Sequence, residues 1–362
     1  MHNPPASDDT MLNPVGGFEG ADPQGIKRYG IRGLQSLLGS WGEPSFRASQ
    51  LLRWLYAEGA SSYRQMLNLP LSLRQRLEKE EPLAPPELIT SQISLDGTRK
   101  YLLRLADGHC VETVAIMDGS RLTVCFSTQI GCAMGCVFCA TGTRGLVRSL
   151  QPGEMLDQLI VAAKDTGQRV TNAVAMGEGE PFANYDATLS ALRIMNSNDG
   201  PRIGARHLTV STCGLLAQID RFAQEPEQFT LAVSLHSAVQ STRDALMPAM
   251  TKQPLDALRR HLILYGEQTG RRPSLEVTLI RDINDTSQEV AALIDFARGM
   301  LCHVNLIPFN QGSACSFEPG SASRLREIAS MLQNAGVECS VRQSRGADIQ
   351  GACGQLKGNR PG

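Results

Sequence analysis

Residues 131–142 read GCAMGCVFCATG and set three cysteines, Cys132, Cys136 and Cys139, at the spacing C-x3-C-x2-C. The segment follows a predicted strand, Leu122–Ser127, so we expect it to form the loop at the carboxyl end of that strand. Three thiolates so close in sequence can bind one face of a cubane iron–sulfur cluster and leave one iron open to a small molecule. Zinc usually takes four ligands, commonly from paired C-x2-C units, and no second pair lies downstream. The spacing favours an iron–sulfur cluster over zinc or three free thiols.

Predicted strands and helical segments alternate around this loop over about 220 residues. Helical patterns such as 152–165 and 286–300 separate the strands, and Pro152 and Pro254 suit the first turn of a helix. This alternation predicts an α/β fold with a parallel sheet, built as a complete (βα) barrel, a partial barrel or an open sheet. The predicted strands are Leu122–Ser127, Asn172–Met176, His207–Ser211, Thr230–Leu235, Leu275–Leu279, Val304–Pro308 and Glu338–Val341.

The chain divides into four predicted parts. Residues 1–22 are rich in Pro, Gly, Asn and Asp and are predicted to be a flexible tail, and residues 23–86 show the periodicity of a small helical accessory domain, with Ser45 as a helix N-cap. Residues 87–120 are predicted to be a β-meander of hairpins, and residues 121–362 the barrel domain. The meander prediction rests on three Asp-Gly pairs between alternating segments, at Asp96-Gly97, Asp107-Gly108 and Asp118-Gly119.

The composition excludes several classes of protein. The chain has 362 residues, of which 42% are hydrophobic and 20% charged, so it can bury a sizeable core and is not intrinsically disordered. Lys plus Arg number 35 against 36 Asp plus Glu, so no bulk basic field indicates a nucleic-acid partner. No apolar run approaches about 20 residues, and the start MHNPPASDDT is not a secretory signal, which predicts a cytoplasmic protein with no membrane association. Ten cysteines in such a chain indicate metal binding or thiol chemistry rather than a disulfide framework.

The cysteine loop and a series of further motifs resemble the radical S-adenosylmethionine (SAM) superfamily, and within it the RlmN/Cfr family of RNA adenine methyltransferases. FRASQLLRWLY and NLP match the helical amino-terminal region of that family, and CFSTQIGCAMGCVFCATG matches its cluster loop. The motifs MGEGEPFANYD, TVSTCG, VSLHS with LMPAM, NLIPFN and SRGADIQGACGQL follow in the same order. The resemblance implies a partial or complete parallel (βα) barrel of radical SAM type, with one [4Fe–4S] cluster on the three cysteines.

The resemblance also implies where SAM binds. In the family a Gly-Glu-Pro turn binds the methionyl amino group, and this turn maps to Gly179, Glu180 and Pro181. A carboxylate is the natural partner of an ammonium group. A second acid, Glu178, stands where the family leads us to expect an apolar residue, and it either competes with Glu180 or faces solvent. Further SAM contacts map to the ends of other predicted strands, at Ser211, Ser234, Leu235, His236 and Asn310.

Three more residues carry the mechanism that the resemblance implies. Cys353 would accept a methyl group from one SAM molecule, and reductive cleavage of a second would give a 5′-deoxyadenosyl radical that abstracts hydrogen from the S-methyl group. The thio-methylene radical would add to an adenine ring, Glu112 would remove the ring proton, and Cys125 would attack Cys353 to release methylated RNA through a transient disulfide. As isolated residues, the two cysteines are typical of buried packing positions and Glu112 of a solvated strand.

The substrate that the resemblance implies is carbon 2 of an adenine in 23S ribosomal RNA, with transfer RNA as a further candidate. Carbon 8 is the alternative within the family. An external donor such as flavodoxin or ferredoxin would supply electrons, and we expect a monomer. Two other hypotheses are a radical enzyme that acts on a small molecule or a protein, and a metal-binding RNA module without catalysis.

Short basic clusters offer candidate contacts for an RNA backbone, although such clusters are more often solvated surface. Arg144 and Arg148 follow the cluster loop with no acid nearby in sequence. Around Cys353 the basic residues outnumber the single acid, Asp348; they are Arg342, Arg345, Lys357 and Arg360.

The remaining cysteines and two apolar residues of the cluster loop receive simpler assignments. Cys110, Cys213, Cys302 and Cys339 lie in apolar strand contexts and are predicted to be packing residues, and Cys315 is given no role. Met134 and Phe138 are expected to shield the cluster from water.

Overall fold

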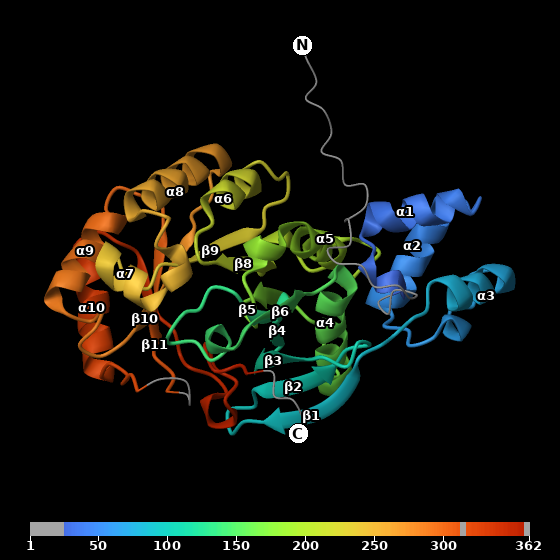
Figure 1. The fold of residues 1–362 in the computed structure, drawn as a ribbon, viewed down its shortest axis with the longest axis horizontal. Coiled ribbons are helices and arrows are strands. Elements are labelled where there is room, and N and C mark those ends of the chain that lie inside the picture. Colours follow the sequence, from blue (N-terminus) through green and yellow to red (C-terminus); the bar gives the residue numbers. More distant parts are fainter. Residues whose placement is uncertain (1–24, 312–315, 358–362) are drawn as a thin grey trace, which may run out of the picture.

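The computed structural model describes residues 25–311 and 316–357, so the predictions for the tail at 1–22, for Cys315 and for Arg360 lie outside the described residues. The fold is α/β, as the sequence predicts. Its main body is one ten-stranded sheet whose strand order follows the chain, from β1 to β4 and on from β7 to β12 (Figure 1). This order does not return to its start within the described residues, so the parallel part is a partial barrel.

The parallel strands lie where the sequence predicts them, to within one or two residues at each end. The inner strands bury side chains on both faces, as in β9, where Leu231, Ala232 and Val233 have no exposed surface. The strands are β4 (Arg121–Cys125), β7 (Asn172–Ala175), β8 (Leu208–Thr212), β9 (Thr230–Ser234), β10 (Ser274–Leu279), β11 (His303–Pro308) and β12 (Cys339–Val341).

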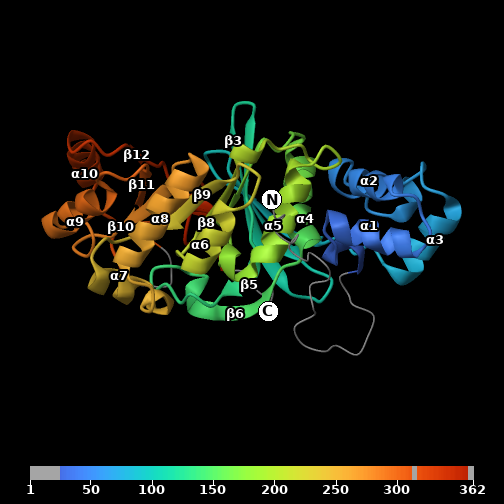
Figure 2. The ribbon, with the colours of Figure 1, turned by 90° about the horizontal axis from the view of Figure 1, so that it is seen from above.

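Helices connect these strands and cover one face of the sheet. Because the chain crosses the sheet in one direction, right-handed crossovers place the connecting helices on the same side (Figure 2), except that α7 lies beside the loop at 133–144. Pro152 opens its helix as predicted, whereas Pro254 lies one residue earlier, at the N-cap. The helices are α4 (Pro152–Thr166), α5 (Tyr185–Asn196), α6 (Leu216–Ala223), α7 (Gln240–Leu246), α8 (Leu255–Thr269), α9 (Ser287–Ala297) and α10 (Ala322–Asn334).

The antiparallel part of the sheet is the meander of β1 (Glu87–Ile93), β2 (Arg99–Arg104) and β3 (Cys110–Asp118). Each predicted Asp-Gly pair joins two antiparallel neighbours, and in each pair the glycine takes a positive φ, between +59° and +84°. β3 pairs antiparallel with β4, which pairs parallel with β7, so the meander continues the barrel sheet. This continuity sets β3 beside the first strand of the barrel.

The amino-terminal helices pack against the outside of the barrel. α1 (Ile31–Ser40), α2 (Phe46–Leu52) and α3 (Leu71–Glu80) share one continuous apolar core with α4 and α5. Lys27 forms a buried ion pair with Asp157 of α4. Across 25–311 and 316–357, no helix combines the length and the apolarity needed to span a membrane.

A short hairpin between β4 and α4 was not predicted. It consists of β5 (Gln129–Cys132) and β6 (Gly145–Ser149), and it carries the cysteine loop at its tip. Gly131 has φ +74°, and a Cβ atom there would lie 2.0 Å from the carbonyl oxygen of Gly145. Only glycine allows the two strands to approach so closely just before the first cysteine.

Candidate active site

The three cysteines of the loop lie at the carboxyl end of β4, as the sequence predicts. Cys132 ends β5, and Cys136 and Cys139 follow in the loop. Burial raises the pKa of Cys132 to about 12, and the other two thiols add to this rise, so the three sulfurs are close enough to repel one another as thiolates. Binding to a cationic iron–sulfur core relieves such repulsion, and the all-thiolate donor set fits a [4Fe–4S] cluster. Within the described residues, no three His, Cys, Asp or Glu side chains are arranged to hold a single metal ion. The cysteine ligands of a cubane cluster do not need that arrangement, because each of them binds a separate iron.

Backbone hydrogen bonds fix the cluster loop on two sides. The Val137 N–H donates to the Leu246 carbonyl of α7 at 3.1 Å, and the Ala140 N–H donates to the Gly354 carbonyl at 2.8 Å. Met134 and Phe138 pack against a separate apolar cluster that includes Leu246 of α7. The loop that holds the cluster therefore contacts the residue after Cys353.

The turn assigned to the SAM amino group is buried beside the cluster loop. Gly179 has φ +104°, and a Cβ atom there would lie 2.6 Å from the side chain of Gln129. The Glu180 carboxylate accepts the Phe182 N–H at 2.9 Å and the Cys213 N–H at 2.7 Å, and burial raises its pKa. These bonds aim a carboxylate at the carboxyl ends of the strands, where an ammonium group would find a partner.

The other predicted SAM contacts lie at the ends of neighbouring parallel strands. Ser211 belongs to β8, Ser234 ends β9, and Asn310 follows β11. Leu235 has no exposed surface, so its backbone rather than its side chain is available to a ligand. The sheet brings these positions to one edge, because adjacent parallel strands end together.

His236 is held neutral beside the cluster loop. Its backbone has φ +57°, its Nδ1 accepts the Thr278 N–H at 3.2 Å, and its ring meets that of Phe138 edge-on, with centroids 4.6 Å apart. Burial and the nearby Arg243 lower the pKa of His236 to about 3. A neutral imidazole with an occupied Nδ1 leaves Nε2–H as the donor that a ligand can meet.

Glu178 neither competes with Glu180 nor faces solvent, which were the two alternatives expected from the sequence. It is 2% exposed, so the prediction that it faces solvent is wrong. Its carboxylate accepts the Glu112 N–H at 2.9 Å and the Gly131 N–H at 3.3 Å, so it does not share the partners of Glu180. Burial raises the pKa of Glu178 to about 7, and the Glu112 carboxylate adds to this rise. Glu178 thus links β3 to the hairpin that carries the cluster loop.

The two cysteines assigned to methyl transfer lie close together at the open side of the site. Cys125 ends β4 and is half-buried, whereas Cys353 is exposed in the segment after β12. Burial and the nearby Cys353 raise the pKa of Cys125, and Arg342 opposes the rise. The Asn310 side chain donates to the Cys353 carbonyl at 3.4 Å, so a predicted SAM contact touches the predicted methyl carrier.

The Cys353 segment is anchored to the meander. The Asp348 carboxylate accepts the Ser94 hydroxyl at 2.5 Å and the Leu95 N–H at 3.1 Å, at the turn between β1 and β2. The Gly346 N–H donates to the Asp96 carboxylate at 3.0 Å. Arg342 forms an ion pair with buried Glu276 at 3.4 Å, so the first of the four predicted RNA-contacting basic residues already has an acidic partner.

Glu112 is buried rather than solvated. Only 3% of it is exposed, and its carboxylate lies 3.3 Å from the ammonium group of Lys100 and accepts the Lys357 N–H at 2.6 Å. Lys100 was missed by the sequence reasoning, although a signal existed. The Asp107-Gly108 turn pairs Leu102 with Glu112, which makes Lys100 the diagonal neighbour of Glu112 on the same face.

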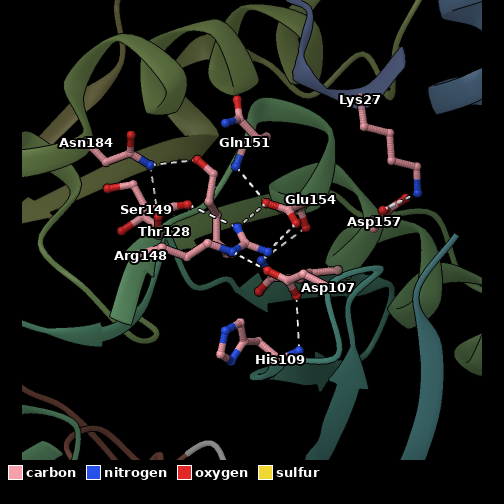
Figure 3. A network of polar contacts seen from close by, with 12 residues as sticks. Lys27, Asp107, His109, Thr128, Arg148, Ser149, Gln151, Glu154, Asp157 and Asn184 are labelled. Carbon is pink, nitrogen blue, oxygen red and sulfur yellow. Dashed lines mark hydrogen bonds and ion pairs between the residues drawn. The ribbon is translucent and has the colours of Figure 1, made fainter. Parts of the chain in front are cut away.

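Arg148, one of the candidate RNA-backbone contacts, already has two acidic partners in the fold. Its guanidinium lies 2.6 Å from Asp107 and 2.8 Å from Glu154, and Figure 3 shows it enclosed by these acids. Glu154 also accepts the Gln151 N–H at the start of α4. Arg148 joins the meander to α4 and is not a free phosphate contact.

Family models match two regions of the chain. Residues 29–81 match the ribosomal RNA large subunit methyltransferase N-terminal domain, and residues 126–263 match the radical SAM superfamily. The first match covers the amino-terminal helices, and the second begins directly after Cys125.

Similar proteins span nearly the whole chain. A probable dual-specificity RNA methyltransferase RlmN of Alkaliphilus oremlandii is 40% identical, over 90% of this chain and 95% of its own length. One of Thermosynechococcus vestitus is 42% identical, over 90% of this chain and 95% of its own. The crystal structure of a radical SAM methyltransferase from Sphaerobacter thermophilus superposes with a TM-score of 0.88 at 42% identity, over 93% of this chain and 100% of its own. The chain therefore belongs to the RlmN family of radical SAM RNA methyltransferases, which act with a [4Fe–4S] cluster and SAM.

Proposed function

We propose that this RNA methyltransferase modifies carbon 2 of an adenine in 23S ribosomal RNA, with transfer RNA as a second substrate. The methyl group would pass through S-methylated Cys353 and a covalent protein–RNA adduct that Cys125 resolves. One observation carries the proposal: the segment that bears Cys353 packs against the two adjacent strands that bear Glu112 and Cys125. The Lys357 N–H reaches the Glu112 carboxylate at 2.6 Å, and Cys353 lies near enough to Cys125 to raise its pKa.

The proposal assigns separate groups of residues to cluster binding, SAM binding and methyl transfer. When bound, the cluster and SAM supply the electron, the methyl group and the means of hydrogen abstraction. Cys132, Cys136 and Cys139 would hold the cluster. The SAM contacts would be Gly179, Glu180, Ser211, Ser234, Leu235, His236 and Asn310. The exposed Cys353 can reach a base extruded from folded RNA.

Glu112 and Cys125 would complete the transfer. The Lys100 ammonium group lies 3.3 Å from the Glu112 carboxylate, which would accept the proton lost from the adenine ring, while the single electron released with it would return to the oxidised cluster. The thiolate of Cys125 would then attack the sulfur of Cys353, so that an S–S bond forms and the bond from that sulfur to the methylene carbon breaks. The electron pair stays on the carbon, which takes up a proton and becomes the methyl group. An external dithiol would reduce the disulfide and restore both thiols.

The proposed reaction also has requirements for SAM, for an electron donor and for the place where the enzyme acts. Two SAM molecules are consumed per methylation, one as the methyl donor and one as the source of 5′-deoxyadenosine. An electron donor of the flavodoxin or ferredoxin type reduces the cluster. The enzyme acts as a monomer in the cytoplasm, where both RNAs are found.

The test compares Cys353→Ala with Cys302→Ala, each with a reconstituted cluster. Cys302 precedes β11 at the amino-terminal end of the sheet, opposite the site, and makes a matched control. The assay follows label from methyl-labelled SAM into 23S ribosomal RNA fragments and transfer RNA, and the products are separated as nucleosides. We expect 2-methyladenosine with Cys302→Ala and no methylation with Cys353→Ala, while both keep the visible absorbance of the cluster.

Other outcomes of this experiment decide against the proposal in distinct ways. 8-Methyladenosine would assign the carbon-8 specificity of the wider family. Full methylation by Cys353→Ala would reject the methyl-carrier role. No methylation of either RNA by the wild-type enzyme, with 5′-deoxyadenosine still formed, would indicate a different substrate.

A further inference from the structure

A buried arginine behind the cluster loop has no acidic partner. Arg243 of α7 has no exposed surface and is the largest of the fully buried side chains. Its Nη2 donates to the Cys213 carbonyl at 2.6 Å, whereas Nε and Nη1 have no partner among the described residues. Its sequence neighbour Asp244 is bound by the Gln240 side chain at 2.7 Å. A buried guanidinium without a counter-charge lowers the stability of the fold, so we expect an anion close to Arg243.

The groups around Arg243 belong to the cluster site. Its charge acts on the thiols of Cys136 and Cys213, and the last residue of its helix, Leu246, accepts the N–H of Val137 in the cluster loop. Leu246 and Met247 also pack in the same apolar cluster as Cys136. Arg243 therefore lies on the closed, protein-facing side of the loop.

Cys213 connects the arginine to the cluster ligand. Its carbonyl accepts the Arg243 Nη2–H, and its side chain packs against the apolar cluster that contains Cys136, as its predicted packing role implies. A nearby positive charge stabilises the reduced state of an iron–sulfur cluster, because reduction adds negative charge to the cluster and its sulfur ligands.

We propose that Arg243 is the counter-cation of the iron–sulfur cluster and that it raises the reduction potential of the cluster. A [4Fe–4S] core on three thiolates would carry net negative charge that grows on reduction, and the buried guanidinium, whose Nε and Nη1 have no partner among the described residues, would offset that charge. Burial strengthens the effect, since the low dielectric of the interior screens the charges little. Arg243 is a positioning residue in this scheme, because it touches neither RNA nor the reacting atoms.

The test is a redox titration of the reconstituted cluster, monitored by electron paramagnetic resonance in the absence of SAM and RNA. With Arg243→Gln we expect the ratio of reduced to oxidised cluster at a fixed potential to fall by about tenfold, which is about 59 mV for a one-electron couple. Arg243→Lys keeps the charge and should recover most of the wild-type potential. Arg259→Gln is the control, since Arg259 of α8 bonds the carbonyls of Phe296 and Arg298.

A second variant covers the case in which Arg243→Gln does not fold or retain iron. Arg243→Met keeps the apolar stem of the side chain and removes its charge, and it should lower the same ratio by a similar factor. An unchanged potential in every variant that holds a cluster would overturn the proposal. An unchanged potential together with weaker SAM binding would reassign Arg243 to the SAM carboxylate. Because the readout needs no RNA, its result is independent of the proposed carbon-2 methylation.

Discussion

The two sides of the active site are built in opposite ways. The side that we propose for the cofactors comprises the cluster loop, Glu180 and His236, and here buried groups are satisfied by backbone N–H donors from the strand ends. The side that we propose for methyl transfer comprises Glu112, Cys125, Arg342 and Cys353, and here charged side chains form ion pairs and one thiol is exposed. The first side is supported by barrel strands, and the second by the meander and the segment after β12.

This difference matches the chemistry that each side must support. A reduced cluster and a bound cofactor need exclusion of water, and α7 with its apolar neighbours provides it. Methyl transfer to a macromolecule needs an accessible thiol on a firmly held loop. The hydrogen bonds that Asp348 and Asp96 accept from backbone N–H groups hold the Cys353 segment in place. Substitutions on the two sides should therefore have separable effects on cluster properties and on methyl transfer.

The largest effect is expected for Cys125→Ala on the transfer side. Without its thiol the adduct between Cys353 and RNA cannot be resolved, so turnover should stop after one round and a covalent protein–RNA species should accumulate. Denaturing gel electrophoresis with labelled RNA measures it, and Cys302→Ala should show none. Normal turnover by Cys125→Ala would show that another group resolves the adduct.

Glu112→Gln should come next. The amide cannot accept the ring proton, so methylation should fall by about 10²–10⁴-fold, while the cluster signal and methylation of Cys353 remain. Single-turnover assays, with mass spectrometry of the Cys353 peptide, separate the two steps. Glu87→Gln in β1, whose acid pairs with Arg104 on the surface, is the matched control. Equal loss in both variants would indicate a structural effect on the meander.

A moderate effect is expected for Glu178→Gln, which tests the link between the two sides. The pKa of Glu178 is raised in the folded protein, from 4.5 to about 7, so its stabilising contribution is complete below about pH 4.5 and is lost as the pH rises through about 7. This loss amounts to about 3 kcal/mol at most. Thermal unfolding at about pH 5 and about pH 8 should show a smaller pH difference in the variant. An unchanged difference would mean that Glu178 does not titrate in this range.

The smallest effect on function is expected for Arg148→Gln. Losing the pairs with Asp107 and buried Glu154 should lower the free energy of unfolding by about 2 kcal/mol. RNA affinity should stay unchanged, because the guanidinium is already occupied. Thermal unfolding and a salt titration of RNA binding provide the two measurements. A weaker salt dependence of binding in the variant would restore Arg148 as a phosphate contact.

Local patterns predicted much of this molecule. Asp107-Gly108 predicted the hairpin that pairs β2 with β3, and the pattern at Thr230–Leu235 predicted the strand β9. The failures concern partners distant in the chain. Nothing near Glu178 in sequence indicates that it accepts the Glu112 N–H, and nothing near Arg148 indicates Asp107. The β5–β6 hairpin was missed because its strands are short and the cluster loop separates them. Arg243 was missed because a charged residue on a short helix is typical of a solvated surface.

The central claim is that the methyl group reaches RNA through Cys353. The most direct measurement is a pulse–chase with SAM carrying a deuterated methyl group. The enzyme is first incubated with labelled SAM without RNA, then freed of it, and then given RNA and unlabelled SAM for one turnover. Mass spectrometry should find deuterium on the Cys353 peptide after the pulse and in the adenine methyl group after the chase. Methylated adenine without deuterium, from enzyme whose Cys353 peptide stays labelled, would contradict the account.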